Sequence, residues 1–240
     1  MAAAVGEPVI AYVFPLGPPG GSYAELVVVP EASVVPAPKG FRLAEAATLL
    51  LNGATARLAL DALSLAAGAA VAIVGGAGAV GAYAVQLAKL DGVVVITDAS
   101  PEDDSFVRSL GADIVVRRSA DVAAAIRSEF PAGVPGLIDA ATLDAAVLPA
   151  IADGGGLVTL KGWTGQSERG IEIHPISSFG SATDTALFDR LRKLAEEHVL
   201  TLRVAAVLPA ARAAEAHRRL AAGGVRGRIV LNFTAPLQSD

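Results

Sequence analysis

Residues 71–89 read VAIVGGAGAVGAYAVQLAK, and this stretch decides the fold. An apolar run typical of a buried strand precedes the glycines, and a helical pattern follows them. Gly76, Gly78 and Gly81 form a GxGxxG motif at that junction. The first glycine permits a tight turn, the second lets the backbone approach a pyrophosphate, and the third allows close packing of helix on strand. The motif therefore predicts a dinucleotide site.

The next expected strand ends in VITDAS, which places Asp98 seventeen residues after Gly81. An acid at this place is expected to accept hydrogen bonds from the adenosine ribose hydroxyls. A carboxylate would repel a 2′-phosphate, and no basic residue lies between Asp98 and Val107 to attract one. The pattern predicts that the cofactor is NAD(H) in preference to NADP(H).

Short apolar runs alternate with helical patterns over residues 70–178. The runs are continuous rather than alternating, which is typical of parallel strands buried on both faces. Strand-helix alternation implies right-handed crossovers and a doubly wound parallel sheet. We predict an α/β fold of the Rossmann type for this part of the chain.

The flanking segments have a different character. Residues 9–13 and 23–29 are β-rich runs, and a helical pattern follows at 41–65, where Gly53 predicts a break or bend. The predicted domains are a dinucleotide-binding domain over 41–200 and a second, β-containing portion built from 1–40 and 201–240.

The composition excludes several classes of protein. The 240 residues are 53% hydrophobic and 18% charged, which excludes disorder and supports a sizeable core. The net charge of −5, without a basic stripe, predicts no nucleic-acid partner. No run is long and apolar enough for a membrane span, and no signal peptide is evident, so we expect a cytoplasmic protein without a membrane partner. With no cysteine, and three histidines outside any metal-ligand spacing, we expect no metal.

Further segments surround the glycine motif in a recognisable order: VGEPVIAY, GGSYAELVVVP, FRLAEAATLLLNGATARLAL, FVRSLGAD, DGGGLVTLKG and AEAHRRLAAGGVRGRIVL. Together they resemble the medium-chain dehydrogenase/reductase superfamily, in its zinc-free quinone-oxidoreductase-like branch. The resemblance implies a Rossmann domain inserted into a GroES-like catalytic domain, of which the chain ends would form a residual, truncated portion. It implies hydride transfer from NAD(P)H to a small-molecule quinone, enone or similar activated carbonyl. It also implies a homodimer formed through the Rossmann edge strand near residues 170–175.

The resemblance also assigns site residues. Ala79, Val80 and Gly81 would meet the pyrophosphate and Asp98 the ribose. The remaining cofactor-binding positions, which would border the adenosine or nicotinamide, are Asn52, Thr55, Ala140, Ala141, Lys161 and Gly162.

The catalytic residue stays open, with Tyr12, Asn52 and Lys161 as candidates. Tyr12 is a candidate proton donor, although a half-buried strand aromatic is the favoured interpretation. Lys161 ends an expected strand, where it could stabilise a developing enolate or attract a cofactor phosphate. Arg228 is interpreted as a surface charge.

Two other functions remain open. The family's preceding β-strands have no counterpart before Met1. A shortened member could therefore use its cleft for a non-redox step, such as a cyclisation, isomerisation or dehydration in metabolite biosynthesis. A dinucleotide-binding module that acts with a partner chain is the third alternative.

Overall fold

The structure is a computed structural model that describes residues 4–14 and 21–233. The chain forms two compact units. One is Thr55–Ser177, and the other combines Met1–Ala54 with Ser178–Asp240. The sequence-based division instead assigned 41–200 to the dinucleotide-binding domain. Each unit is described by itself.

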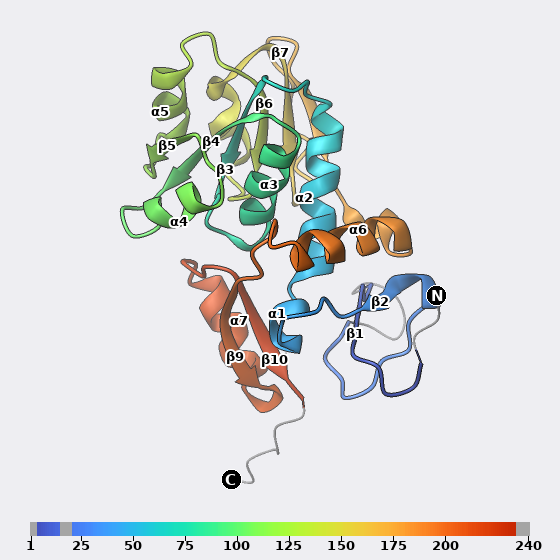
Figure 1. Cartoon of the computed structure of the whole chain (residues 1–240). Helices are drawn as coiled ribbons and strands as arrows, with labels where there is room; N and C mark the ends of the chain where they lie inside the picture. The colour runs from blue at the N-terminus through green and yellow to red at the C-terminus, as the bar shows by residue number, and fades with distance from the viewer. Residues whose placement is uncertain (1–3, 15–20, 234–240) are drawn as a thin grey trace. The chain divides into compact units, whose positions relative to one another are not determined.

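Six parallel strands form one sheet in the unit Thr55–Ser177, in the order β5-β4-β3-β6-β7-β8 (Figure 1). The strands are β3 (Ala70–Val74), β4 (Val94–Ala99), β5 (Ile114–Arg117), β6 (Val134–Asp139), β7 (Ile151–Thr159) and β8 (Glu172–Pro175). The chain starts in the middle of the sheet, adds two strands on one side, and then returns to add three on the other. The order therefore reverses between β3 and β6, where doubly wound folds bind their ligands. The predicted α/β fold is confirmed.

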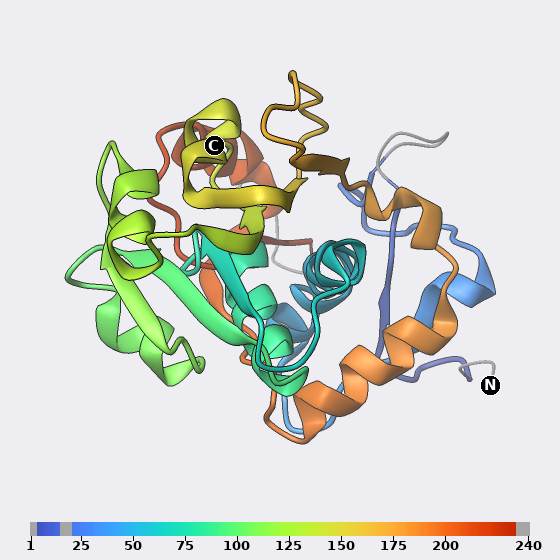
Figure 2. The same ribbon diagram turned by 90° about the horizontal axis from the view of Figure 1, so that it is seen from above.

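Helices lie on both faces of this sheet (Figures 1 and 2). They are α3 (Ala79–Leu90), α4 (Asp104–Ser109), α5 (Val122–Glu129) and the 3-10 segment η2 (Asp144–Ala150). Fully buried aliphatic side chains such as Ile126, Leu137 and Ile151 form the core under α5 and η2. The helix predicted over 142–152 is a 3-10 segment, and it contains Pro149, which has no N–H for an α-helical bond.

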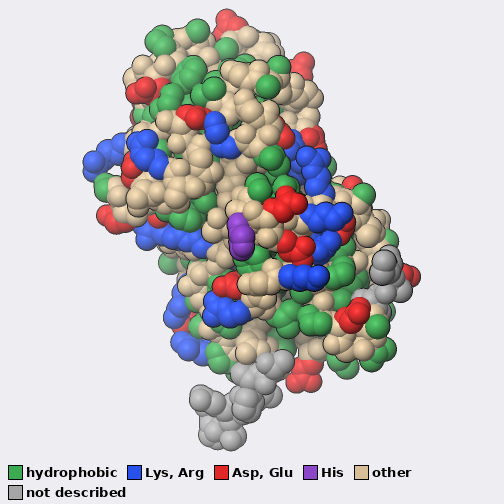
Figure 3. Space-filling view, viewed as in Figure 1, with side chains coloured by type: hydrophobic (Ala, Val, Ile, Leu, Met, Phe, Trp, Pro, Cys, Tyr) green, Lys and Arg blue, Asp and Glu red, His purple; other side chains and the backbone are tan. Residues whose placement is uncertain are grey.

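In the other unit, the residues that the structure describes form two small sheets. β1 (Val9–Ala11) pairs antiparallel with β2 (Val34–Pro36), and β9 (Val204–Pro209) pairs parallel with β10 (Arg228–Asn232). Its helices are α1 (Leu43–Ala46), α6 (Thr185–Glu196) and α7 (Ala213–Ala221), with 3-10 segments η1 (Glu31–Ser33), η3 (Ser178–Ser181) and η4 (Ala210–Arg212). α2 (Leu49–Leu63) begins in this unit and ends in the other. Acidic and basic side chains alternate over α6 (Figure 3), where Arg192 pairs with both Asp189 and Glu196.

Two local predictions are wrong. The run 23–29 is not a strand, and its Leu26 and Val28 are 91% and 90% exposed, because no neighbouring strand lies beside them in the described structure. Gly53 does not break its helix, since α2 continues through it. A Cβ at Gly53 would lie 3.1 Å from the Leu191 side chain of α6, so the glycine allows the two helices to approach closely.

Candidate functional site

The glycine turn joins β3 to α3 with almost no spare space. Gly75 has a φ of +87°, a conformation that favours glycine, and Gly78 is the N-cap of α3. A Cβ at Gly76 would lie 2.0 Å from Thr97 Oγ1, and a Cβ at Gly81 would lie 2.2 Å from the Gly75 carbonyl oxygen. Gly76 and Gly81, two of the three predicted motif glycines, are therefore needed for packing. Gly75, which bears the unusual backbone angle, was not among the predicted site residues.

The first turn of α3 is suited to an anion. Gly78, Ala79 and Val80 are partly exposed at the carboxyl edge of the sheet. The first N–H groups of a helix have no partner within it, and they carry the positive end of the helix dipole. A pyrophosphate suits this turn, because its first residues are partly exposed and the turn carries no acidic side chain.

Asp98 lies beside this turn, and its side chain is only 4% exposed. Oδ1 accepts a hydrogen bond from the Gly75 N–H at 2.6 Å, and Oδ2 accepts one from Arg118 Nε at 2.6 Å. The structure therefore places Asp98 next to the glycine motif, and its contact with a ribose stays a prediction. It also adds Arg118, which was missed because it follows β5 rather than the Asp98 strand.

The loop after β6 packs against the same turn. A Cβ at Gly75 would lie 3.2 Å from the Ala140 carbonyl carbon and 3.3 Å from the Ala141 nitrogen. Asp139, which is 2% exposed, holds this loop by accepting hydrogen bonds from the N–H groups of Ala141, Leu143 and Asp144. The structure thus brings Ala140 and Ala141 to the glycine turn. A buried acid at a strand end was the signal that could have identified Asp139.

Lys161 and Gly162 follow β7 and are exposed. Gly162 has a φ of +75°, so the chain turns sharply here. Thr159 donates its hydroxyl hydrogen bond to the Trp163 carbonyl at 3.0 Å, which closes the turn around these two residues. No described contact joins Lys161 or Gly162 to the glycine turn, so their cofactor role stays a prediction.

Tyr12 belongs to the unit of the chain ends, where it is 2% exposed. Its ring stacks on Phe188 with centroids 5.6 Å apart, and its hydroxyl lies 3.0 Å from Ser178 Oγ. Burial raises the pKa of the Tyr12 phenol, although the hydrogen bond with Ser178 lowers it. These contacts favour packing over proton donation.

Asn52 is also buried in that unit, at 2% exposed. Its Nδ2 donates to the Thr48 carbonyl at 2.8 Å, and its Oδ1 accepts a hydrogen bond from Arg228 Nη1 at 3.1 Å. Arg228 is therefore tied to a candidate site residue and is more than the surface charge that the sequence suggested. Thr55, one helical turn further along α2, is partly buried and belongs to the other unit.

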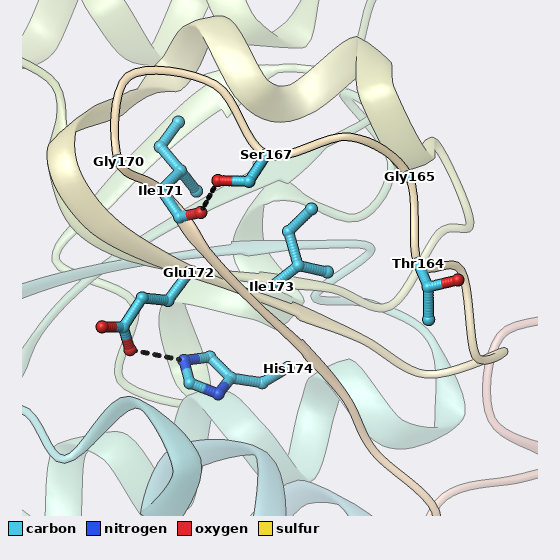
Figure 4. A pocket seen from close by; sticks show the side chains of 8 residues that line it. All are labelled: Thr164, Gly165, Ser167, Gly170, Ile171, Glu172, Ile173 and His174. Atoms are coloured by element: carbon cyan, nitrogen blue, oxygen red, sulfur yellow. Dashed lines mark hydrogen bonds and ion pairs between the residues drawn. The ribbon is translucent and has the colours of Figure 1, made fainter.

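A shallow pocket of about 570 Å³ lies along β8 (Figure 4). It includes Ser167, which donates to the Ile171 carbonyl, and His174, whose Nε2 lies 3.6 Å from Glu172 Oε2. β8 is the last strand of the sheet and pairs with β7 alone. Its other edge is the predicted dimer edge.

Neither a metal-binding cluster nor a membrane-spanning helix occurs among the described residues. Within residues 4–14 and 21–233, no group of three or more His, Cys, Asp or Glu side chains is placed to hold a metal ion. The same residues contain no helix that combines the length and the apolar character needed to cross a membrane.

Comparisons with known proteins agree with this geometry. A sequence model described as zinc-binding dehydrogenase matches residues 110–231. Prostaglandin reductase-3 of Mus musculus is 37% identical over 128 residues, which are 52% of this chain and 32% of that protein. The chloroplast envelope quinone oxidoreductase homolog of Arabidopsis thaliana is 38% identical over 132 residues, 51% of this chain and 39% of that protein. The crystal structure of an NAD-dependent alcohol dehydrogenase has a TM-score of 0.76 at 30% identity, and the match covers 89% of this chain and 65% of that one.

The chain spans about a third of the length of these curated relatives and about two thirds of the solved structure. The family match covers just over half of the 240 residues and runs from the end of α4 into β10. The strand order, the glycine turn and this match give one answer: the chain belongs to the zinc-binding dehydrogenase family, within the medium-chain dehydrogenase/reductase superfamily.

Proposed function

We propose that the protein is an NAD(P)H-dependent oxidoreductase that transfers a hydride to a quinone, an enone or a similar activated carbonyl. The observation that carries the proposal is the glycine turn, with α3 beginning directly behind it and the Asp98 carboxylate fixed beside it. The reductase and oxidoreductase names of the two curated relatives support the same reaction class.

In this proposal the chain binds and orients the cofactor, and the reduced nicotinamide supplies the hydride. The first turn of α3 binds the pyrophosphate through its N–H groups. Asp98 faces the adenosine ribose, and the loop that Asp139 holds borders the cofactor beyond Ala140. Among the catalytic candidates we favour Lys161, because it is exposed after β7, whereas the Tyr12 hydroxyl is buried against Ser178.

The proposed reaction does not use zinc. Zinc sites in proteins use Cys, His and carboxylate ligands in tetrahedral sets. The chain has no cysteine, and the described side chains offer no such group, so they do not fit the metal that the family description names.

NADH in preference to NADPH is the finer proposal for the cofactor, and it rests on the carboxylate of Asp98. The cytoplasmic location stays a prediction from the sequence. For assembly, we propose a homodimer in which two copies of β8 pair along their open edges. Ile173→Lys, a charge on that edge, should shift the molar mass measured by light scattering from dimer to monomer. An unchanged mass, or a monomeric parent protein, would contradict the dimer.

A charge at the start of α3 tests the cofactor site directly. Ala79→Glu places a carboxylate in the first helical turn, where it suits the helix dipole but repels a pyrophosphate. The thermal midpoint should hold or rise, while the affinity for NADH should fall about tenfold or more. Fluorescence titration measures the affinity, and scanning fluorimetry measures the midpoint.

Ala186→Glu is the matched control, because Ala186 lies in the first turn of α6, which belongs to the other unit, and is exposed. It should leave NADH binding unchanged. Equal losses in both variants would refute the site. NADH binding without NADH oxidation, in the presence of quinones and enones, would favour the non-redox or binding-module alternatives.

A further inference from the structure

A separate pocket of about 350 Å³ lies in the unit of the chain ends. Its described lining comes from the start of β9, from α7, from the turn that joins α7 to β10, and from β10 itself (Figure 1). Three arginines line it, Arg203, Arg219 and Arg226, and we call it the arginine pocket. Its volume lies within the range of small-molecule sites.

The backbone holds Arg203 and Arg226 at the same end of the β9–β10 pair. Gly227, which follows Arg226, has a φ of +94°, and a Cβ there would lie 2.5 Å from the Arg203 carbonyl oxygen. The same carbonyl accepts a hydrogen bond from the Arg228 N–H at 3.1 Å. The glycine therefore lets the turn close tightly against the start of β9, so two cationic residues are kept next to each other.

The arginine pocket concentrates positive charge. None of the described residues that line it is acidic. Glu215 of α7 pairs with Arg219, but the same carboxylate also pairs with Arg212, so its single charge is shared between two guanidinium groups. Like charges that line one pocket repel one another, and a bound anion would offset this repulsion.

The lining favours a phosphate monoester over other anions. A monoester carries about −1.5 to −2 charges at neutral pH and three acceptor oxygens, whereas a carboxylate carries a single charge. Guanidinium groups match phosphate oxygens with pairs of N–H donors. Arg203 Nη1 is shielded from solvent, where a contact with an anion is stronger because the local dielectric is low. Val204, Val225 and Ile229, all partly exposed, add apolar surface beside these donors.

We propose that the arginine pocket binds a phosphate monoester that carries an apolar group, with the phosphate held by Arg203, Arg219 and Arg226. The pocket and the glycine motif belong to different units, so this inference does not rest on the proposed dinucleotide site. Phenyl phosphate is the probe, because it joins a phosphate monoester to an apolar ring. It should bind more tightly than inorganic phosphate, since its ring removes apolar surface from water.

Calorimetric titration of the full chain measures the dissociation constant of phenyl phosphate for the parent protein and its variants. Arg226→Gln changes an exposed residue of the turn and should weaken binding about tenfold, the loss expected for a charged hydrogen bond. Val225→Glu adds a carboxylate to the lining and should weaken binding further, through repulsion of the phosphate. The affinity for phenyl phosphate should not change when NADH is present at saturation.

Arg218→Gln is the matched control, because Arg218 is exposed on α7 and is not among the described lining residues. It removes the same charge as Arg226→Gln but should leave the affinity within about twofold. Equal losses in these two variants would overturn the site, because they would indicate a general attraction to basic surface. A parent protein that does not bind phenyl phosphate, or one from which NADH displaces it, would also overturn the site.

Discussion

The two units of this chain differ in how their β-strands are covered by neighbouring strands and helices. In Thr55–Ser177, the central strands of one six-stranded sheet have neighbours on both edges and helices on both faces. All five residues of β3 are buried. In the unit of the chain ends, the described residues form four strands in two separate pairs, and each of these strands has one described partner.

The surface reflects this difference. Thirteen large hydrophobic residues are exposed in the described structure, and all but Leu90 and Leu143 belong to the unit of the chain ends. A strand with one partner leaves hydrogen-bonding groups and apolar side chains without a cover. Local strand propensity therefore forms stable structure only where neighbours are supplied.

The largest loss of stability should come from a substitution in the interior of the six-stranded sheet. Leu137, in the central strand β6, is fully buried, so Leu137→Ala leaves a cavity among close-packed neighbours. The free energy of unfolding should fall by about 2–5 kcal/mol. Urea denaturation measures the loss, and a cost well below this range would mean that the sheet is not the tightly packed region.

The second largest effect on stability should come from one of two glycine substitutions, one in each unit. Both Gly81 and Gly53 lie inside helices, so alanine gains helix propensity at each site. At Gly81 the new Cβ meets backbone atoms at 2.2 Å, and Gly81→Ala should cost about 1–3 kcal/mol.

At Gly53 the Cβ meets only the flexible end of Leu191, at 3.1 Å. Gly53→Ala should therefore cost less than Gly81→Ala. Thermal denaturation of both variants checks the contrast, and equal midpoints would refute the packing explanation.

The burial of Tyr12 predicts that the unit of the chain ends loses stability at alkaline pH. Burial raises the pKa of its phenol above the ordinary value of about 10, despite the Ser178 hydrogen bond that lowers it. The contribution of the Tyr12 phenol to the free energy of unfolding is complete at pH values below its pKa in the unfolded chain. It is lost as the pH rises through its pKa in the folded protein.

Tyr12→Phe removes this titration together with a hydrogen bond. The parent protein should be more stable by about 1 kcal/mol near neutral pH, and this advantage should shrink at strongly alkaline pH. Urea denaturation across the alkaline range measures both values. An advantage that grows with pH would contradict the sign of the shift.

The smallest effect on folding should come from the exposed run 23–29. Leu26→Ser changes a side chain that is 91% exposed, so the free energy of unfolding should stay within about 0.5 kcal/mol. Self-association at high protein concentration should fall, because the exposed apolar area shrinks. Sedimentation at increasing concentration checks this, and a large loss of stability would mean that the run is packed after all.

Much of the candidate site could be predicted from local sequence, because the glycine turn and the strand ends depend on residues that are close together in the chain. The motif glycines follow the end of β3 and Asp98 lies near the end of β4, and parallel strands bring those ends to one edge of the sheet. Arg118 and Asp139 escaped the sequence analysis for different reasons. Arg118 reaches Asp98 only because β5 lies beside β4, while Asp139 acts on the backbone of its own loop.

The sequence by itself determined the parallel sheet, the glycine turn and the position of Asp98, because apolar periodicity and glycine spacing act over a few residues. Only the tertiary structure decided that Asp98 is paired with Arg118, that Tyr12 is buried on Phe188 and that the run 23–29 pairs with no strand among the described residues. These outcomes depend on which segments distant in the chain lie next to each other. Burial and pairing are properties of such contacts, and no local pattern specifies them.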